Sequence, residues 1–282
     1  MAAETEKEER AYVYMVRCAG GQLYTGWTND PASRLHAHKS GKGAKCTRAL
    51  GAQRFAYLER CTDKSAALRR EAALKKLTKA QKEALCAEWA EKNLPRLSLA
   101  TRADAAEILD IYNWYVLHHT ATFQVTPSSL PEYEDWVDST RALIPLLLAR
   151  DGEGKLLGYA CAHRYHPREA YDWAVESTIY CAPDARGFGV GDTLYRALLD
   201  ILDGMGYWNV YALVADPNPA SERIHARLGF TCVGREPHTA YKFGWLGLST
   251  WWLPLRRGNE KPEPTHPLTQ EQVEEILGKY QA

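Results

Sequence analysis

The sequence predicts a two-domain protein of the α/β (α+β) class. Its 282 residues suit two domains better than one. Strand-like and helix-like segments occur on both sides of Pro95, which ends a helical pattern. These observations divide the chain into a flexible lead, a first domain, a linker, a second domain, and a final linker with a short helix, at residues 1–10, 11–92, 93–96, 97–257 and 258–282.

The charge balance differs between the two domains. Residues 1–95 hold 18 Lys and Arg against 11 Asp and Glu, a net charge of +7. Because the whole chain is neutral, residues 96–282 carry a net charge of −7. A basic domain ahead of an acidic one suggests that the first domain, residues 11–92, meets a polyanion such as DNA. A solvated basic face is the alternative, and charge alone does not decide between the two.

The cysteines and the first residues favour a cytoplasmic protein. The seven cysteines are scattered and include no Cys-x-x-Cys pair, so neither a disulfide framework nor a zinc site is expected. Residues 1–10 are acidic and polar, unlike a signal peptide. No apolar run reaches the ~20 residues that a membrane span needs, so no membrane association is expected.

The first domain begins with a predicted β-hairpin that turns at Gly20-Gly21. A helix is expected from Asp30, with Pro31 in its first turn, where proline is tolerated. Arg34 and His38 are four residues apart and therefore share one face of this helix. The hairpin strands, a third strand and two further helices are predicted at 12–16, 23–26, 55–58, 64–76 and 78–92.

The tyrosines of the hairpin form a recognisable pattern. Tyr12-Val13-Tyr14 is followed by Leu23-Tyr24-Thr25-Gly26, with Tyr14 and Tyr24 ten residues apart, and then by Arg34. This pattern resembles the GIY-YIG nucleases, and its continuation is similar to their small single-domain bacterial branch. The resemblance implies a small mixed sheet flanked by helices. It also implies that Tyr14 and Tyr24 lie at the reaction centre, that Arg34 stabilises phosphate charge, and that Glu71 holds one divalent cation.

Phosphodiester cleavage needs an activated water, charge stabilisation and a metal, and a carboxylate with bound waters suits Mg²⁺. Tyr14 is the preferred general base. His38 is either an aid to proton transfer or, as its residue type by itself favours, a surface histidine. The first glycine of the family pattern is replaced by Tyr12, and Tyr-Ile-Gly has become Tyr-Thr-Gly. Three alternatives stay open for this domain: it cleaves DNA, binds a nucleic acid without cutting it, or is inert.

The second domain is predicted to combine strands and helices. Asp104 and Glu107 have the spacing of a capping box ahead of a helix. Strands are expected from Leu97 and at 143–149, 155–163, 176–181 and 210–214. Helices are expected at 105–113, 192–202 and 222–228, and over 268–281 with Thr269 as its cap.

A glycine-rich loop separates the strand at 176–181 from the helix at 192–202. It reads Arg186-Gly187-Phe188-Gly189-Val190-Gly191, the spacing Arg-x-x-Gly-x-Gly. Glycines let backbone N–H groups approach an anion, and the following helix adds the positive end of its dipole. This context favours a pyrophosphate cradle over glycines that serve only to turn the chain.

The loop resembles the acyl-CoA loop of the GNAT N-acetyltransferases, and residues 175–191 are similar to their phosphinothricin and methionine sulfoximine acetyltransferase branch. The resemblance covers roughly residues 97–256 and implies a mixed-sheet acetyltransferase fold with acetyl-CoA as cofactor. The residues it implies for cofactor binding are Ile179, Tyr180, Cys181, Arg186, Gly187, Phe188, Gly189, Val190, Gly191, Asn218 and Ser221.

Glu176 is the predicted catalytic residue of the second domain. An amine must lose a proton before it attacks a thioester, and a carboxylate beside the cofactor strand can accept that proton. A salt-bridged strand carboxylate is the alternative, which the resemblance outweighs. The resemblance also implies substrate contacts for Phe123, Arg168, Tyr171 and Lys242.

Other aromatic and histidine positions have open roles. His166 stands where the family has an arginine, which suggests a shifted acceptor specificity. His225 occupies the position where many GNAT proteins carry a tyrosine that protonates the leaving thiolate. Trp245, Trp251 and Trp252 are expected in the core or in a dimer contact, so a homodimer through the second domain is a further hypothesis.

The leading functional hypothesis is an acetyl-CoA-dependent N-acetyltransferase that acts on a small amino-acid-like amine and carries a GIY-YIG module in front. The alternative is a nucleic-acid endonuclease or binding protein whose acetyltransferase module acts on a macromolecular partner. In a third reading, the front module aids only solubility or assembly.

Overall fold

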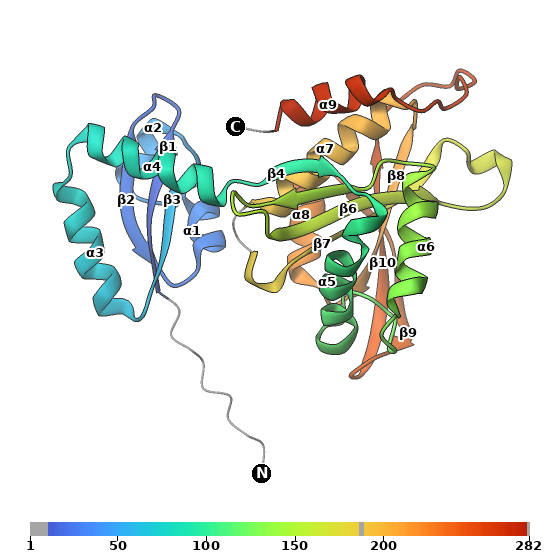
Figure 1. Cartoon of the computed structure of the whole chain (residues 1–282), viewed down its shortest axis with the longest axis horizontal. Helices are drawn as coiled ribbons and strands as arrows, with labels where there is room; N and C mark the ends of the chain where they lie inside the picture. Colours follow the sequence, from blue (N-terminus) through green and yellow to red (C-terminus); the bar gives the residue numbers. More distant parts are fainter. Residues whose placement is uncertain (1–10, 186–188, 281–282) are drawn as a thin grey trace, which may run out of the picture. The chain divides into compact units, whose positions relative to one another are not determined.

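The computed structural model describes residues 11–185 and 189–280, and Figure 1 labels their helices and strands. The chain forms two compact units, Met1–Leu94 and Pro95–Ala282. In the described part of the chain, none of the helices has the length and apolar character needed to cross a membrane.

The first unit is built on a three-stranded sheet in the order β2–β1–β3. Tyr14 of the central strand pairs with Gly26 on one side and with Leu58 on the other, and both pairings are antiparallel. Within the described residues this sheet is therefore antiparallel, whereas a mixed sheet was expected. The strands are β1 (Ala11–Cys18), β2 (Leu23–Thr28) and β3 (Ala52–Cys61).

Four helices accompany this sheet within the described residues. They are α1 (Pro31–Lys39), α2 (Lys45–Leu50), α3 (Lys64–Lys76) and α4 (Lys79–Asn93). Asp30 caps α1 by accepting from the Ser33 N–H, as its position before Pro31 suggests. The short helix α2 was not predicted, because its six residues are too few for an apolar periodicity. Trp89 of α4 is buried and donates its indole N–H to the Leu58 carbonyl at 2.7 Å, which fixes α4 on β3.

The second unit contains a seven-stranded sheet in the order β4–β5–β6–β7–β8–β10–β9. Its strands are β4 (Arg96–Leu99), β5 (Leu147–Arg150), β6 (Leu156–Arg164), β7 (Ala174–Cys181), β8 (Asn209–Asp216), β9 (Thr231–Tyr241) and β10 (Trp245–Pro254). The β7–β8 pair is parallel and the other pairs are antiparallel. The mixed sheet that the resemblance implied is confirmed here.

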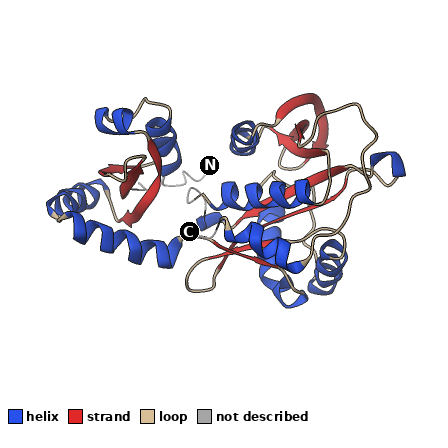
Figure 2. Ribbon diagram, turned by 90° about the horizontal axis from the view of Figure 1, so that it is seen from above, coloured by secondary structure: helices blue, strands red, loops and turns tan. Residues whose placement is uncertain are grey.

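Helices lie on both faces of this sheet (Figure 2). They are α5 (Ala105–His118), α6 (Leu130–Arg141), α7 (Val190–Gly204), α8 (Pro219–Leu228) and α9 (Gln270–Gly278). The rings of Tyr112 and Tyr115 on α5 contact Tyr180 of β7. Gly191 of α7 lies against the side chains of Ile179 and Cys181 on the other face of the same strand. The two faces of β7 are therefore covered by different helices.

Two helix starts differ from the sequence prediction. The side chain of Asp104 accepts from Thr101 rather than capping with Glu107, and Thr101 and Asp104 form the capping box instead. Asp104 and Glu107 both bind Arg150 of β5, at 2.7 and 2.5 Å. The predicted box was wrong because a cation from a distant strand holds both carboxylates. The unpredicted helix α6 begins at a capping box of Ser129 and Glu132.

The final helix was predicted correctly. Thr269 caps α9, and Val273 and Leu277 bury their side chains in the main core. The three-to-four-residue spacing of these apolar side chains gives a short helix one buried face.

Candidate active sites

In the first unit, a buried hydroxyl links two elements. Tyr14 is fully buried on β1, and its hydroxyl lies 2.8 Å from Nε2 of His38. The Arg34 Nε–H donates to the same oxygen at 2.9 Å. Arg34 and His38 both lie on α1, so the predicted helix face delivers both groups to Tyr14. His38 is 1% exposed, which excludes the alternative of a surface histidine.

The neighbours of His38 fix its tautomer. The Thr47 hydroxyl donates to the Ala44 carbonyl at 2.9 Å, so its oxygen is left to accept from Nδ1–H of His38 at 2.6 Å. Nε2 of His38 is then unprotonated and accepts from the Tyr14 hydroxyl. Burial and the nearby Arg34 charge lower the pKa of His38 to about 4, so the ring is neutral near pH 7.

The other predicted residues of this unit surround the same hydroxyl. The Tyr24 ring centroid lies 5.2 Å from that of His38 and 6.4 Å from that of Tyr14. Burial raises the pKa of Tyr14, hydrogen bonding to Arg34 opposes the rise, and the nearby Glu71 charge adds to it. Glu71 pairs with Lys75 at 2.6 Å, and its side chain is 14% exposed. Among the described residues, no cluster of three or more His, Cys, Asp or Glu side chains could hold a metal.

Gly26 makes room for the Tyr14 hydroxyl. A Cβ atom at this position would lie 2.6 Å from Oη of Tyr14, closer than real contacts allow. Gly43 does the same for His38, since a Cβ there would lie 2.4 Å from its Nδ1. Both glycines are therefore required by the side chains that they face.

In the second unit, the parallel strands β7 and β8 are paired at their N-terminal ends and separate beyond them. They pair only from Ala174↔Asn209 to Glu176↔Tyr211. Ala182 N–H donates to the Leu157 carbonyl, so the even-numbered residues of β7 bond to β6. The backbone groups of Ser177, Ile179 and Cys181 therefore point to the β8 side, where the ladder has ended. The Cys181 carbonyl already accepts from the Tyr115 hydroxyl at 2.7 Å.

The glycine-rich loop leads into α7 beside this open edge. Arg186, Gly187 and Phe188 lie outside the described residues. Gly189 has φ of 84°, a left-handed conformation that glycine adopts readily, and it is the N-cap of α7. A Cβ at Gly191 would lie 3.2 Å from Ile224 and 3.4 Å from Cys181, so this glycine lets α7 approach β7 and α8. Val190 is buried, so its side chain faces the core.

The other predicted cofactor residues occupy different positions. Asn218 caps α8 by accepting from the Ser221 N–H at 3.2 Å. Tyr180 turns its ring toward α5 and donates its hydroxyl to the Ala121 carbonyl at 3.3 Å. The helix α8 thus begins, like α7, near the carboxyl ends of the central strands, where anions are commonly bound.

His225 belongs to a buried polar chain. Its Nδ1–H donates to the Ser221 carbonyl at 2.8 Å, and its Nε2 lies 3.0 Å from the Tyr195 hydroxyl. The Ser177 hydroxyl lies 2.6 Å from the Tyr195 oxygen and donates to the Tyr211 carbonyl at 3.1 Å. Burial lowers the pKa of His225. This series of buried polar side chains therefore ends at the point where β7 and β8 separate.

Glu176 stands on the opposite face of β7 at this same point. Its side chain is 22% exposed, and its Oε2 lies 3.6 Å from Nε2 of His163, its partner on β6. Strand alternation places His163, Glu176 and Tyr211 on one face of the sheet. An accessible carboxylate thus lies where the parallel ladder opens.

The predicted substrate residues are divided between two ends of this face. Phe123 is 39% exposed, beside Thr122, whose carbonyl accepts from the buried Lys242 ammonium at 2.9 Å. Lys242 also donates to the Tyr115 carbonyl at 3.2 Å, so it holds two backbone segments together. Arg168 is exposed.

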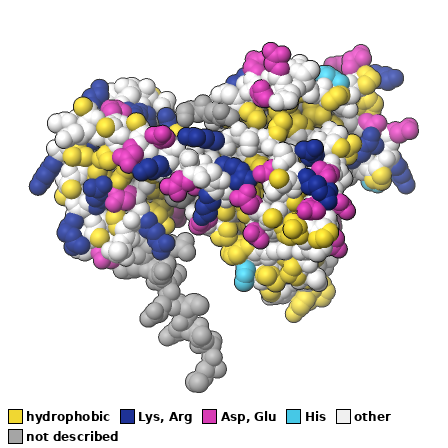
Figure 3. Space-filling view, viewed as in Figure 1, with side chains coloured by type: hydrophobic (Ala, Val, Ile, Leu, Met, Phe, Trp, Pro, Cys, Tyr) yellow, Lys and Arg dark blue, Asp and Glu magenta, His cyan; other side chains and the backbone are white. Residues whose placement is uncertain are grey.

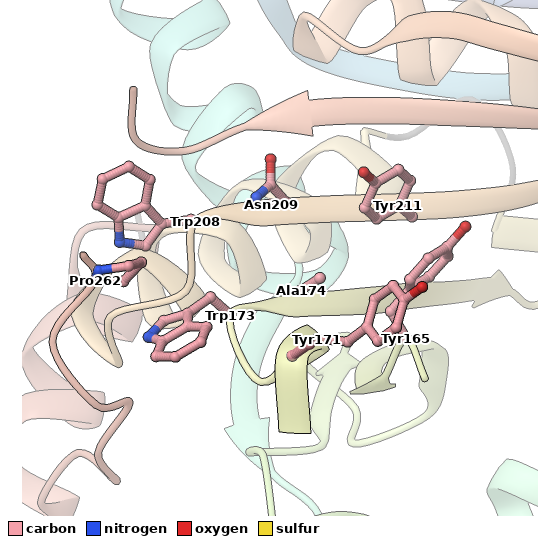
Figure 4. A pocket seen from close by; sticks show the side chains of 9 residues that line it. Tyr165, Tyr171, Trp173, Ala174, Trp208, Asn209, Tyr211 and Pro262 are labelled. Atoms are coloured by element: carbon pink, nitrogen blue, oxygen red, sulfur yellow. The ribbon is translucent and has the colours of Figure 1, made fainter. Parts of the chain in front are cut away.

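Tyr171 lies at the other end of the face and lines a pocket of about 270 Å³ together with Tyr211, the β8 partner of Glu176 (Figure 4). The sequence analysis named only Tyr171 of the residues that line it. The lining residues are Tyr165, Ala170, Tyr171, Trp173, Ala174, Trp208, Asn209, Tyr211 and Pro262. The signal that could have found the others is the set of aromatic residues at the starts of β7 and β8.

Comparison with protein families gives two matches. The model of the GIY-YIG catalytic domain matches residues 10–84, and that of the Acetyltransferase (GNAT) family matches residues 108–230. These matches coincide with the Tyr14 cluster in the first unit and with the sheet that carries Glu176 in the second.

Individual relatives agree. A phosphinothricin N-acetyltransferase of Streptomyces viridochromogenes is 36% identical over 60% of this chain and 90% of its own length. An L-methionine sulfoximine/L-methionine sulfone acetyltransferase of Pseudomonas aeruginosa is 37% identical over 54% of this chain and 90% of its own.

Among solved structures, a GNAT superfamily phosphinothricin acetyltransferase from Sinorhizobium meliloti in complex with AcCoA matches with a TM-score of 0.58 and 33% identity. This match covers 60% of this chain and 93% of the other. The chain therefore belongs to the GNAT acetyltransferase family, and it carries a GIY-YIG catalytic domain ahead of its acetyltransferase part.

Proposed function

We propose that the chain is an acetyl-CoA-dependent N-acetyltransferase that acts on the amine of a small amino-acid-like molecule. The observation that carries this proposal is the position of Glu176, an accessible carboxylate where β7 and β8 separate. The relatives named above, which acetylate phosphinothricin or methionine sulfoximine, support the same reaction class.

The residues around the opening fit acetyl-CoA. Backbone groups of Ile179 and Cys181 face the gap beyond Glu176, so an extended polar arm can lie along β7. The N-terminus of α7 provides unpaired N–H donors and a positive dipole end for pyrophosphate. The bound cofactor would supply an acetyl thioester.

The side chains on the other face would handle the amine. Glu176 accepts a proton from the incoming ammonium, which leaves a neutral nitrogen able to attack. His163 lies close enough to orient that carboxylate. Lys242 holds the Thr122 carbonyl, and so keeps Phe123 at the edge of the acceptor site. We assign Lys242 to positioning, because its ammonium is buried against backbone oxygens.

The test is release of free CoA thiol from acetyl-CoA in the presence of a panel of amines. Glu176→Gln should lower kcat by roughly 100- to 10,000-fold for any accepted amine, while acetyl-CoA affinity stays unchanged. Glu153→Gln is the matched control, since Glu153 is an exposed carboxylate in the turn between β5 and β6. Wild-type turnover that survives in Glu176→Gln would refute the assigned base.

A second activity is supported by a separate observation, the contact of Tyr14 with His38 and Arg34 in the first unit. We propose Mg²⁺-dependent cleavage of DNA phosphodiester bonds by this unit. Glu71 would hold the ion, and Arg34 would stabilise the phosphate charge. Tyr14 would accept a proton from the attacking water as its own proton passes to His38 in the same step.

Cleavage of a DNA panel with and without Mg²⁺ tests this activity. Loss of cleavage in Glu71→Ala, with retained salt-dependent DNA binding, would support the assignment. Binding by the wild type with no cleavage of any substrate would leave the unit a binding module. Absence of both would make it inert.

A homodimer through the second unit is supported by exposed hydrophobic side chains. Tyr241, Phe243 and Trp245 at the turn between β9 and β10 are 67%, 70% and 62% exposed. Hydrophobic side chains are visible at the lower end of the larger unit, where this turn lies (Figure 3). Trp251, by contrast, is buried in the core. Light scattering of wild type and Trp245→Ser would distinguish a dimer through this turn from a monomer.

A further inference from the structure

We propose that the pocket beside Glu176 binds the uncharged aromatic side chain of the acceptor amine. This inference rests on the proposed acetyltransferase function, and it names the acceptor class that the pocket would select. The acceptors named for the relatives are acidic or polar amino-acid analogues, so the proposal predicts a different preference for this chain.

The pocket adjoins the predicted base on the same face of the sheet. Ala174 precedes Glu176 by two residues on β7, so their side chains point the same way about 7 Å apart. Tyr211, the β8 partner of Glu176, also lines the pocket. An amine held at Glu176 can therefore place its side chain in the pocket, while the open edge of β7 lies in the other direction along the strand.

The walls of the pocket are aromatic. Tyr165 and Tyr211 stack with ring centroids 4.2 Å apart and an angle of 21°, and Tyr171 lies 6.1 Å from Tyr165. Trp173 and Trp208 stand at the other end of the pocket, next to Pro262 (Figure 4). Rings in such clusters attract further aromatic rings through stacked or edge-to-face contacts.

The charges of the pocket argue against an anionic side chain. None of its lining residues is Lys, Arg, Asp or Glu. Arg164 is paired with Asp172 at 3.3 Å. A phosphinate in this pocket would find no cation among the lining residues to pair with. An uncharged ring needs no such partner.

One wall comes from the segment after the last strand. Trp173 donates its indole N–H to the Glu263 carbonyl at 2.7 Å, next to Pro262. The Leu255 N–H donates to the Trp208 carbonyl at 2.8 Å, so this segment is held against the start of β8. This segment therefore closes the pocket at the end formed by Trp173 and Trp208.

The experiment compares kcat/KM of the full chain for tryptophan, phenylalanine, alanine, lysine, phosphinothricin and methionine sulfoximine. The expected result is at least a tenfold preference for the two aromatic amino acids. Trp208→Ala should raise KM for tryptophan roughly tenfold or more and leave alanine turnover within twofold. Trp27→Ala, in the first unit, is the matched control and should change neither.

A gain-of-function variant keeps the proposal testable even if Trp208→Ala fails to fold. Ala170 is exposed and lines the pocket, so Ala170→Lys adds an ammonium at little structural cost. This variant should shift the ratio of phosphinothricin to tryptophan turnover at least tenfold toward phosphinothricin. If wild type prefers phosphinothricin or lysine, the aromatic assignment is wrong while the acetyltransferase function stands. If no amine is turned over although acetyl-CoA binds, both proposals fall.

Discussion

The hydroxyl of Tyr14 lies 2.8 Å from Nε2 of His38, in a buried contact between β1 and α1. Thr47 accepts from the other ring nitrogen, because its own proton goes to the Ala44 carbonyl. The direction of these side-chain hydrogen bonds is thus set: Tyr14 donates to His38, and His38 donates to Thr47. The Tyr14 proton is therefore directed at Nε2 of His38, while its oxygen accepts from Arg34.

Removing the Thr47 hydroxyl should disturb this order. Thr47→Val keeps the shape of the side chain but leaves Nδ1–H of His38 without an acceptor, which costs about 1–3 kcal/mol. The tautomer with the proton on Nε2 should then appear in ¹⁵N NMR spectra of the ring. Cleavage, where wild type shows it, should fall at least tenfold with unchanged DNA affinity. Thr62→Val, at an exposed threonine of the same unit, should retain the wild-type spectrum.

The lowered pKa of His38 predicts a pH dependence of stability. The pKa is about 4 in the folded protein and near 6.5 when unfolded, so between these values the unfolded chain binds more protons. Stability should therefore be lost as the pH falls from 6.5 toward 4. Between pH 7 and pH 5, the free energy of unfolding of the wild type should fall by about 2 kcal/mol more than that of His38→Gln. Hydrogen exchange of the β1 amides would measure this, and equal losses in both proteins would contradict the buried neutral histidine.

A methyl group at Gly26 should displace Tyr14. Gly26→Ala places a Cβ 2.6 Å from the tyrosine oxygen and 2.8 Å from its Cζ, so the strand or the ring must move. Overpacking of this kind costs about 1–3 kcal/mol. Gly234→Ala is the matched control, because its position on β9 has no atom within 4 Å of the added Cβ. Chemical denaturation should show a lower free energy of unfolding for Gly26→Ala and no such change for Gly234→Ala. Similar stability of both variants would refute the steric argument.

Lys242 should act by holding the loop at residues 120–123 in place, and not by pairing with a charge on the substrate. Lys242→Met keeps the aliphatic length but removes the donor to the buried Thr122 carbonyl, at a cost of about 1–3 kcal/mol. KM for the amine should rise, and hydrogen exchange at residues 120–123 should increase. Lys279→Met, at an exposed lysine, should change neither quantity. A raised KM without faster exchange in the loop would instead favour direct substrate contact.

The fold class could be predicted from the sequence, and the candidate site residues could be named from it, because their signals are local. The spacing of Tyr14 and Tyr24 belongs to one hairpin, and the glycine-rich loop leads directly into α7. The stripe of Leu194, Leu198 and Ile201 marks that helix through its own periodicity, and all three side chains are buried.

Other features depended on partners far apart in the chain. The burial of His38 was not predictable, because its partner Thr47 lies on a helix too short to predict. Asp104 and Glu107 had the spacing of a cap, but Arg150 binds both. The aromatic pocket unites residues from 165 to 262, which no local pattern relates.

The sequence by itself determined which side chains are available for chemistry at each site: a tyrosine cluster with one carboxylate in the first unit, and Glu176 beside a glycine-rich loop in the second. Only the tertiary structure decided which groups are buried, which tautomer His38 adopts, and which residues line the aromatic pocket. The physical reason is that motifs and helix periods are fixed by neighbours along the chain. Burial, hydrogen-bond direction and pocket chemistry are fixed by neighbours in space.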